Sequence, residues 1–247
     1  MISLKNKEEI KILREGGHIL AEIIKELSKD VQPGINADKL DEKAEKLAKK
    51  NNAIPSFKNY NGFPANICVS KNNEVVHGFP FDKILEEGDI VGLDYGLKYK
   101  GLYTDHAITM GVGKISKKAR KLIKVTKKSL EIGIKQISPG LNLGVVSNSI
   151  QTYVESHNYS IVRDLTGHGV GHKVHESPQV PNFGNKNDGP IMQAGLVIAI
   201  EPMVNIGGHQ IKLNKDSWTI VTSDNTLSAH FEHTVLVTED GFEILTK

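Results

Sequence analysis

Apolar residues recur at helical spacing in four stretches of the chain. In the first stretch the pattern is carried by Ile10, Leu13 and Leu20, which fall on one face of a helix. Asn36 precedes the second stretch, and we expect it to be the N-cap because an Asn side chain accepts a hydrogen bond from the first helical N–H groups. The predicted helices cover residues 6–29, 37–50, 117–136 and 143–155.

Similar hexapeptides join the two members of each helix pair. VQPGIN at 31–36 matches ISPGLN at 137–142, an offset of 106 residues. A Pro-Gly turn alone is common, but here each copy follows a helix and precedes a helix. The repeat therefore predicts two half-domains related by a pseudo-twofold axis.

After each helix pair the pattern changes to that of strands. ANICVS, EVVHGF, DIVGLDYG and YTDHAITMGV follow the first pair, and AGLVIAIEPMV, SWTIVTS and AHFEHTVLVT follow the second. No low-complexity linker separates the halves. We therefore expect residues 1–247 to form a single α/β (α+β) domain, with a mostly antiparallel sheet inside and helices outside.

Composition narrows the class of protein. With 38% hydrophobic and 24% charged residues the chain has the composition of a globular protein, and a net charge of +2 gives no indication of DNA binding. Cys68 is the single cysteine, which excludes an intrachain disulfide and agrees with a reducing compartment. The charged N-terminus has no apolar signal region, and no run approaches 18 apolar residues. We expect a cytoplasmic protein that does not enter a membrane.

Two aspartates lie in neighbouring strand-like runs. If the hairpin closes around Tyr99 and Lys100, Asp94 and Asp105 are directly opposite each other on one face of the sheet. Opposed carboxylates repel unless a cation lies between them. A turn of different length, or two solvated aspartates, is the alternative.

Two glutamates also lie in apolar runs. Glu201 ends the run GLVIAI, and Glu232 alternates with His230 and Thr234 on one face of a strand. A buried carboxylate needs a partner or a metal ion. The alternatives are a solvent-exposed strand end for Glu201 and an edge strand for Glu232.

The segment GHGVGHKVHE holds three histidines within eight residues, from His168 through His172 to His175. On a helix the three rings would share one face, but three glycines within five residues disfavour a helix there. In an extended chain His168 and His172 share one face and His175 takes the other. One or two of these rings can reach a site, and a structural role remains the alternative for each.

The order of these motifs resembles the methionine aminopeptidases, whose fold is called pita-bread. Asp…Asp, Gly-His-Gly, Ile-Glu-Pro and Glu-His-Thr carry the resemblance, together with NEVVHGFP and SWTIVTSDNTLSAHFEHTVLVT. It runs from the first helix to the last strand and implies a curved sheet in two pseudo-twofold-related halves. Only 25 residues separate His175 from Glu201, so the chain is similar to a minimal type I enzyme without the helical insertion of type II.

The resemblance implies a metal site held by two carboxylates from each half and one imidazole. Four carboxylates balance two divalent ions in charge, and a set rich in oxygen with one imidazole suits Co, Mn, Fe or Zn. Asp94 shifted by the repeat offset of 106 falls at position 200, next to Glu201. The implied ligands are Asp94, Asp105, His168, Glu201 and Glu232, of which Asp105 and Glu232 bridge the two ions.

The resemblance also implies an activity, the release of methionine from nascent proteins and peptides whose second residue is small. Glu201 would take and return a proton, while His175 and His77 would position the substrate and stabilise the tetrahedral intermediate. The alternatives are another pita-bread aminopeptidase, such as an Xaa-Pro peptidase, and a non-catalytic pita-bread binding protein. The methionine pocket implied by the resemblance is formed by Tyr60, Phe63, Cys68 and Trp218.

The chain departs from the family pattern at three positions. Phe57 and Val174 put the shape of the pocket in doubt, and His106 has no assigned role. The resemblance implies a monomer and a contact with the ribosome. A basic stripe on one helix face can serve such a contact or can be a solvated surface, and it consists of Lys117, Lys121, Lys124 and Lys128.

Overall fold

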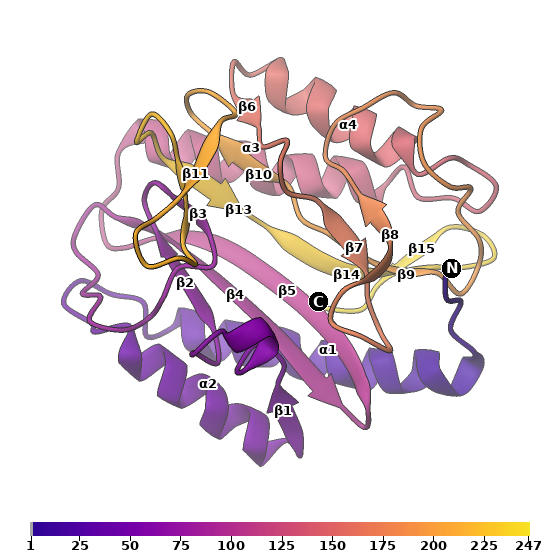
Figure 1. The fold of residues 1–247 in the computed structure, drawn as a ribbon, viewed down its shortest axis with the longest axis horizontal. Coiled ribbons are helices and arrows are strands. Elements are labelled where there is room, and N and C mark those ends of the chain that lie inside the picture. Colours follow the sequence, from indigo (N-terminus) through magenta and orange to yellow (C-terminus); the bar gives the residue numbers. More distant parts are fainter. Residues whose placement is uncertain (1) are drawn as a thin grey trace.

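The computed structural model describes residues 2–247, in which one large sheet is flanked by two pairs of helices (Figure 1). The four predicted helices are confirmed to within about two residues at each end. They are α1 (Lys7–Ser28), α2 (Asp38–Lys50), α3 (Lys117–Ile134) and α4 (Gly144–Glu155). The predicted N-cap of α2 is wrong by one residue: Ala37 takes that position, and the Asn36 side chain accepts from the Asp38 N–H at 3.1 Å.

The sheet is antiparallel throughout and has the order β1-β4-β5-β14-β9-β7-β8, with β2 also paired to β4 and β15 to β14. It is symmetric about its centre, where β5 of the first half pairs with β14 of the second. Its strands are β1 (Ala53–Pro55), β2 (Cys68–Lys71), β4 (Ile90–Tyr99), β5 (Leu102–Gly111), β7 (Gly167–Gly169), β8 (Glu176–Val180), β9 (Val197–Ile200), β14 (Glu232–Val237) and β15 (Phe242–Ile244).

Two three-stranded sheets complete the fold. One joins β13, β10 and β6, and the other joins β11, β12 and β3. A short 3-10 turn, η1 (Tyr60–Gly62), precedes β2. The strands are β3 (Glu74–Val76), β6 (Ser160–Ile161), β10 (Met203–Asn205), β11 (Ile211–Leu213), β12 (Ile220–Thr222) and β13 (Ser228–His230).

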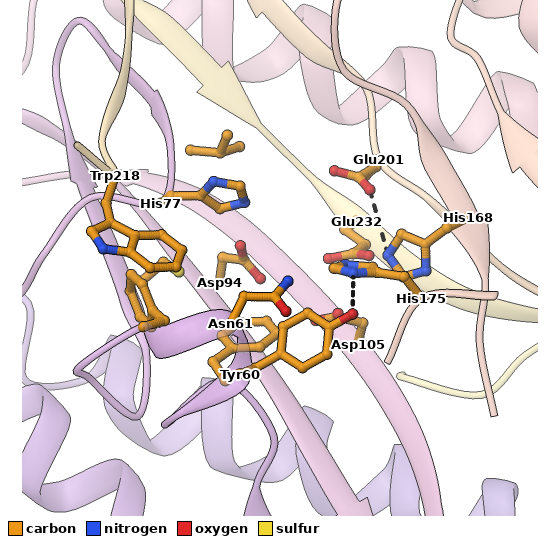
Figure 2. A pocket seen from close by; sticks show the side chains of 14 residues that line it. Tyr60, Asn61, His77, Asp94, Asp105, His168, His175, Glu201, Trp218 and Glu232 are labelled. Carbon is orange, nitrogen blue, oxygen red and sulfur yellow. Dashed lines mark hydrogen bonds and ion pairs between the residues drawn. The ribbon is translucent and has the colours of Figure 1, made fainter. Parts of the chain in front are cut away.

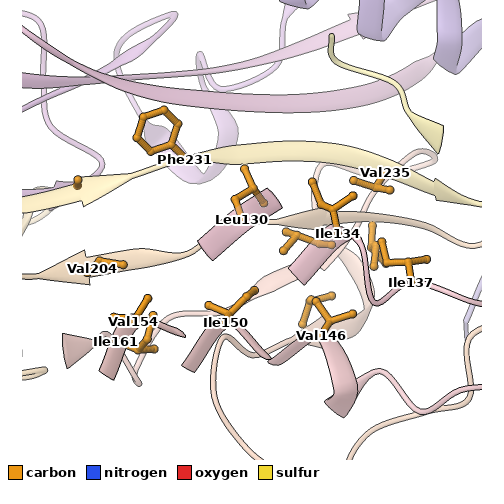
Figure 3. Close-up of a cluster of buried hydrophobic side chains, with 14 of the residues drawn as sticks. Leu130, Ile134, Ile137, Val146, Ile150, Val154, Ile161, Val204, Phe231 and Val235 are labelled. Carbon is orange, nitrogen blue, oxygen red and sulfur yellow. The ribbon is translucent and has the colours of Figure 1, made fainter. Parts of the chain in front are cut away.

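The helices cover only one face of the large sheet. In the second half, Ile134 of α3 shares one apolar cluster with Phe231 and Val235, and Ile150 of α4 packs against α3 at Gly133 (Figure 3). In the first half, the residues of β4 that pack on α1 and α2 are Val91, Leu93, Tyr95 and Leu97. These positions alternate with Gly92, Asp94 and Gly96, which lie on the face of β4 that points away from the helices.

The two hexapeptides adopt the same backbone geometry, which supports the predicted repeat. Gly34 and Gly140 have φ values of 89° and 88°, a left-handed conformation that favours glycine. Their N–H groups donate to Leu85 and Met192 carbonyls at 2.7 and 2.9 Å. These acceptors lie 107 residues apart rather than 106, and with that offset Asp94 corresponds to Glu201 itself.

The hairpin between β4 and β5 closes one residue later than predicted. Tyr99 pairs with Leu102, so Lys100 and Gly101 form the two-residue turn, with φ values of 46° and 91°. Such a turn requires positive φ at both central residues, and a glycine at the second meets that requirement. Asp94 and Asp105 share one face as predicted, but they are diagonal neighbours and not directly opposite, because Asp94 pairs with Ala107.

Among the described residues, no helix is both long enough and apolar enough to span a bilayer.

Replacing Gly101 by Ala is expected to lower the free energy of unfolding by about 1–2 kcal/mol. An added Cβ meets no atom within 4 Å, so the loss comes from the left-handed backbone alone. Urea unfolding at equilibrium measures it. Lys100→Asn is the matched control and should change stability by less than about 0.5 kcal/mol, because Asn tolerates positive φ. Equal stabilities for Gly101→Ala and wild type would contradict the turn geometry.

Candidate metal centre and active site

Strand register brings the predicted ligands to one face of the large sheet, opposite the helices. Asp94 and Glu232 both pair with Ala107, and paired residues project from the same face. Asp105 is two residues from Ala107 and therefore shares that face. His168 pairs with Ala199, as does Thr234, which is two residues from Glu232. Figure 2 shows these side chains converging on one cavity, with Glu201 beside His168.

The inner part of this cluster is compact. Ligand atoms of Asp105, His168 and Glu232 all lie within 4.8 Å of one another. These three residues are at most 8% exposed. Asp94 and Glu201 line the same cavity, and a Glu201 oxygen lies 3.7 Å from His168 Nε2. All five predicted ligands therefore lie around one cavity, and three of them are already within joint reach of an ion.

The buried carboxylates of the cluster have raised pKa values. Burial raises the pKa of Asp94 to about 7. Burial and the neighbouring carboxylates also raise the pKa of Asp105 and of Glu232 well above their ordinary values. These groups do not ionise together unless a cation joins them.

His230 is a member of the site that sequence reasoning did not assign. Its Nε2 lies 3.5 Å from Glu201 Oε2. Despite burial, which opposes ionisation, His230 keeps the pKa of Glu201 below its ordinary value, and the pKa of His230 is raised in turn. His230 lies two residues before Glu232, on the same face of an alternating run, and this position could have indicated from the sequence that it belongs to the site.

The donor set fits divalent ions. Within the described residues, Asp94 Oδ1 is buried without a hydrogen-bond partner, as expected for an atom that awaits an ion. His168 Nδ1 donates to the Gly169 carbonyl at 2.9 Å, which leaves Nε2 free to bind a metal. Oxygen ligands with one imidazole suit Mn, Fe, Co or Zn.

An apolar wall adjoins the carboxylates. The four residues predicted for the methionine pocket and the two predicted substrate histidines all line the same cavity. Rings of Phe63 and Trp218 meet edge to face at 5.4 Å between centroids. Phe57, Asn61 and Val76 complete the lining, and of these only Phe57 drew attention in the sequence. Phe57 therefore shapes the cavity, whereas Val174 is buried outside its lining.

Two neutral histidines face the cavity. Burial lowers the pKa of His175 to about 4, and burial also lowers the pKa of His77. The His175 Nδ1 is 3.1 Å from the Tyr60 hydroxyl, and its ring lies edge-on to His168 at 4.2 Å between centroids. His77 has a φ of 59°, a left-handed conformation that turns the chain at the end of β3.

The expected faces of the three clustered histidines are wrong. His175 lies beside His168, whereas His172 lies outside the cavity, 2.7 Å from a Glu9 carboxylate oxygen. The extended conformation ends at Gly169, and Gly171 has a φ of 142°, so strict alternation does not continue. His106 projects from the helix-covered face and stacks on His233 at 4.6 Å, away from the carboxylates.

A buried cluster of carboxylates and one imidazole, open to an apolar cavity, defines a class: the metal-dependent hydrolases. Comparison with known proteins agrees with that class. The model of metallopeptidase family M24 matches residues 11–239, and the chain belongs to this family.

Individual proteins similar to this chain include methionine aminopeptidases and a prolidase. The chain is 49% identical to methionine aminopeptidase 1 of Bacillus subtilis, over 100% of both chains. It superimposes on the crystal structure of methionine aminopeptidase from Thermotoga maritima with a TM-score of 0.98 and 44% identity, again over 100% of both. Prolidase from Pyrococcus furiosus gives a TM-score of 0.80 at 25% identity, over 99% of this chain and 65% of that one. The predicted pita-bread fold is confirmed.

We expect the metal-free protein to lose stability as the pH rises from about 5 to about 8. The folded pKa of Asp94, about 7, exceeds its value in the unfolded chain, so the protonated folded state is favoured at low pH. That stability is lost as the pH rises through the folded pKa. Divalent metal should reverse the trend, because deprotonated ligands bind it. Thermal unfolding of chelator-treated protein, with and without Mn²⁺, measures both effects.

Asp105→Asn is the matched control for this pH dependence. Removing one buried carboxylate should make the metal-free protein more stable than wild type at high pH and abolish most of the stabilisation by Mn²⁺. A variant with the same pH profile and the same response to Mn²⁺ as wild type would exclude the buried carboxylate cluster as the cause.

Proposed function

We propose that the protein removes the N-terminal methionine from nascent proteins and peptides whose second residue is small. The observation that carries the proposal is the union, in one cavity, of the buried carboxylate cluster with an apolar wall of Tyr60, Phe63, Cys68 and Trp218. Full-length similarity to methionine aminopeptidases supports the choice of substrate. The preference for a small second residue rests on that similarity.

We propose that the cavity holds two divalent ions, which when bound polarise the scissile carbonyl and activate water for its hydrolysis. Asp105 and Glu232 would hold the ions at the centre of the cluster, because they lie close together on the two strands that meet at the pseudo-twofold axis. Asp94 completes one side, and His168 with Glu201 completes the other. The cavity draws ligands from both halves, so residues 1–247 act as one catalytic domain.

Glu201 is proposed to carry the proton. Its carboxylate is ionised beside His230, and it lies at the edge of the cluster near His168, where it can accept a proton and return it. His175 and His77 stay neutral, so each can donate one hydrogen bond to substrate without placing a positive charge beside the ions. The Tyr60 hydroxyl holds the His175 ring toward the cavity.

The methionine side chain is proposed to enter the apolar end of the cavity. Phe63 packs against Phe79 and Trp218, which makes that wall rigid. Cys68 lies on β2 opposite Asp94, so its sulfur lies between the pocket and the ligands. Burial raises the pKa of Cys68 far above its ordinary value, which keeps it an apolar thiol.

An Xaa-Pro peptidase is the second candidate, favoured by the shared fold of the prolidase. That protein is longer, and this chain covers 65% of it. Cleavage of Xaa-Pro dipeptides separates the two candidates.

Cellular context stays a prediction. The four lysines at positions 117, 121, 124 and 128 are exposed on α3, as a ribosome contact or a solvated face requires. Lys128 pairs with Glu131 at 2.9 Å. Cytoplasmic location and a monomeric state are proposed from the resemblance.

Purified protein supplied with Mn²⁺, Co²⁺ or Fe²⁺ is expected to release methionine from Met-Ala-Ser and little from Met-Lys-Ser. A long charged second residue should not fit beside the two histidines. Chromatography of the products measures the release. Absence of cleavage with every ion, or equal cleavage of Xaa-Pro peptides, would overturn the proposed function.

Glu201→Ala and Asp105→Ala are each expected to lower kcat by at least about a thousandfold, because each removes a ligand and one removes the proton carrier. His172→Ala is the matched control from the histidine cluster. It should keep kcat within about threefold, since its contact with Glu9 is exposed. Steady-state kinetics on Met-Ala-Ser test all three, and comparable losses in all three would refute the assignment.

A further inference from the structure

The segment that carries His175 has little regular structure of its own. Residues 170–175 join β7 to β8 without belonging to a helix or a strand. Gly171 accepts from the Tyr103 N–H at 2.8 Å, and Val170 donates to the Val197 carbonyl at 3.1 Å. Both contacts lie at the start of the segment. Further along, the Gly171 N–H donates to the Lys173 carbonyl at 3.2 Å, and Glu176 pairs with Gly169 in the sheet. Val174 and His175 lie between these backbone contacts, so side chains also contribute to their position.

One such side chain comes from the N-terminus of the protein. Lys5 is bound beside β9, where its N–H donates to the Gly195 carbonyl at 2.7 Å. Its side chain is fully buried and forms an ion pair with Glu176, the residue after His175. The Glu176 side chain is 11% exposed. The pair thus joins the first residues of the chain to the start of β8.

The ion pair crosses the His175 segment at close range. A Cβ added to Gly171 would lie 2.3 Å from Lys5 Cε, so the lysine stem passes directly over that glycine. The ammonium also donates to the Ser3 carbonyl at 3.2 Å. A buried ammonium needs a charged partner, and within the described residues Glu176 is the one paired with it.

We propose that Lys5 and Glu176 are positioning residues that hold His175 in its productive orientation. Glu176 is bonded covalently to His175 and is held by its ion pair with Lys5, while the His175 ring contacts the Tyr60 hydroxyl. Lys5 and Glu176 are both absent from the lining of the cavity that holds the carboxylate cluster, although Glu176 lines an adjoining cavity with His175. We therefore assign both an effect through His175. This inference rests on the proposed function, because it assigns His175 a role in that reaction.

The test uses the full-length protein with Mn²⁺ and Met-Ala-Ser. Lys5→Met keeps the apolar stem and removes the charge. It should lower kcat at least about tenfold with KM within about twofold, since small displacements of a positioned group cost rate. The His175 imidazole NMR signals, recorded on the protein loaded with diamagnetic Zn²⁺ instead of Mn²⁺, should shift relative to those of wild type. Lys5→Arg, which restores the charge, should recover most of the activity.

Two further variants separate positioning from general stability. The double variant Lys5→Met/Glu176→Gln leaves no unpaired buried charge, so its thermal stability should exceed that of Lys5→Met while its kcat stays low. Arg14→Met is the matched control, because it removes an exposed pair with Glu243 from the same N-terminal region. It should leave kcat and the His175 signals unchanged.

The proposal is overturned if folded Lys5→Met keeps wild-type kcat and unshifted His175 signals, or if the double variant recovers kcat together with stability. The two failures are distinguishable. If wild-type protein releases no methionine, the proposed function fails, and the NMR signals of His175 still report whether Lys5 positions it.

Discussion

The burial of four carboxylates on one face of a single sheet is the constraint on which the rest of this structure depends. Burial first, and the neighbouring carboxylates in addition, raise the pKa values of Asp94, Asp105 and Glu232, so the cluster is costly to ionise without a cation. A cluster of this kind persists only if the surrounding fold is stable enough to hold it. Favourable packing elsewhere in the molecule must therefore offset the free-energy cost of this site.

That stability comes from the opposite face of the sheet. α1 and α2 pack on the first half, and α3 and α4 pack on the second, each through a continuous apolar cluster. Side chains alternate along a strand, so the strands that pack on the helices with one face carry the carboxylates on the other face. The pseudo-twofold arrangement then places equivalent carboxylates, Asp94 and Glu201, on either side of the central strands.

Much of the fold was predictable from local pattern. Helical periodicity located all four helices, and the hexapeptide repeat anticipated the two halves. The prediction failed where one residue of register mattered. The turn at Lys100 and Gly101 depends on positive φ, and the start of α2 depends on an isolated bridge between Asn36 and Ile84. Alternation also failed past Gly169, since irregular backbone has no period. His230 was missed because its partner, Glu201, lies far away in sequence.

The sequence by itself determined which groups are available: five predicted ligands in recognisable motifs, two histidines, and apolar residues for a pocket. Composition and periodicity are local properties, so they can be read from the sequence alone. Only the tertiary structure decided which of those groups meet. Strand register set Asp94 diagonal to Asp105. The irregular segment 170–175 placed His175 against His168 and left His172 outside, and the N-terminal residues brought Lys5 to Glu176. The physical reason is that these contacts join residues far apart along the chain, where no local pattern constrains distance.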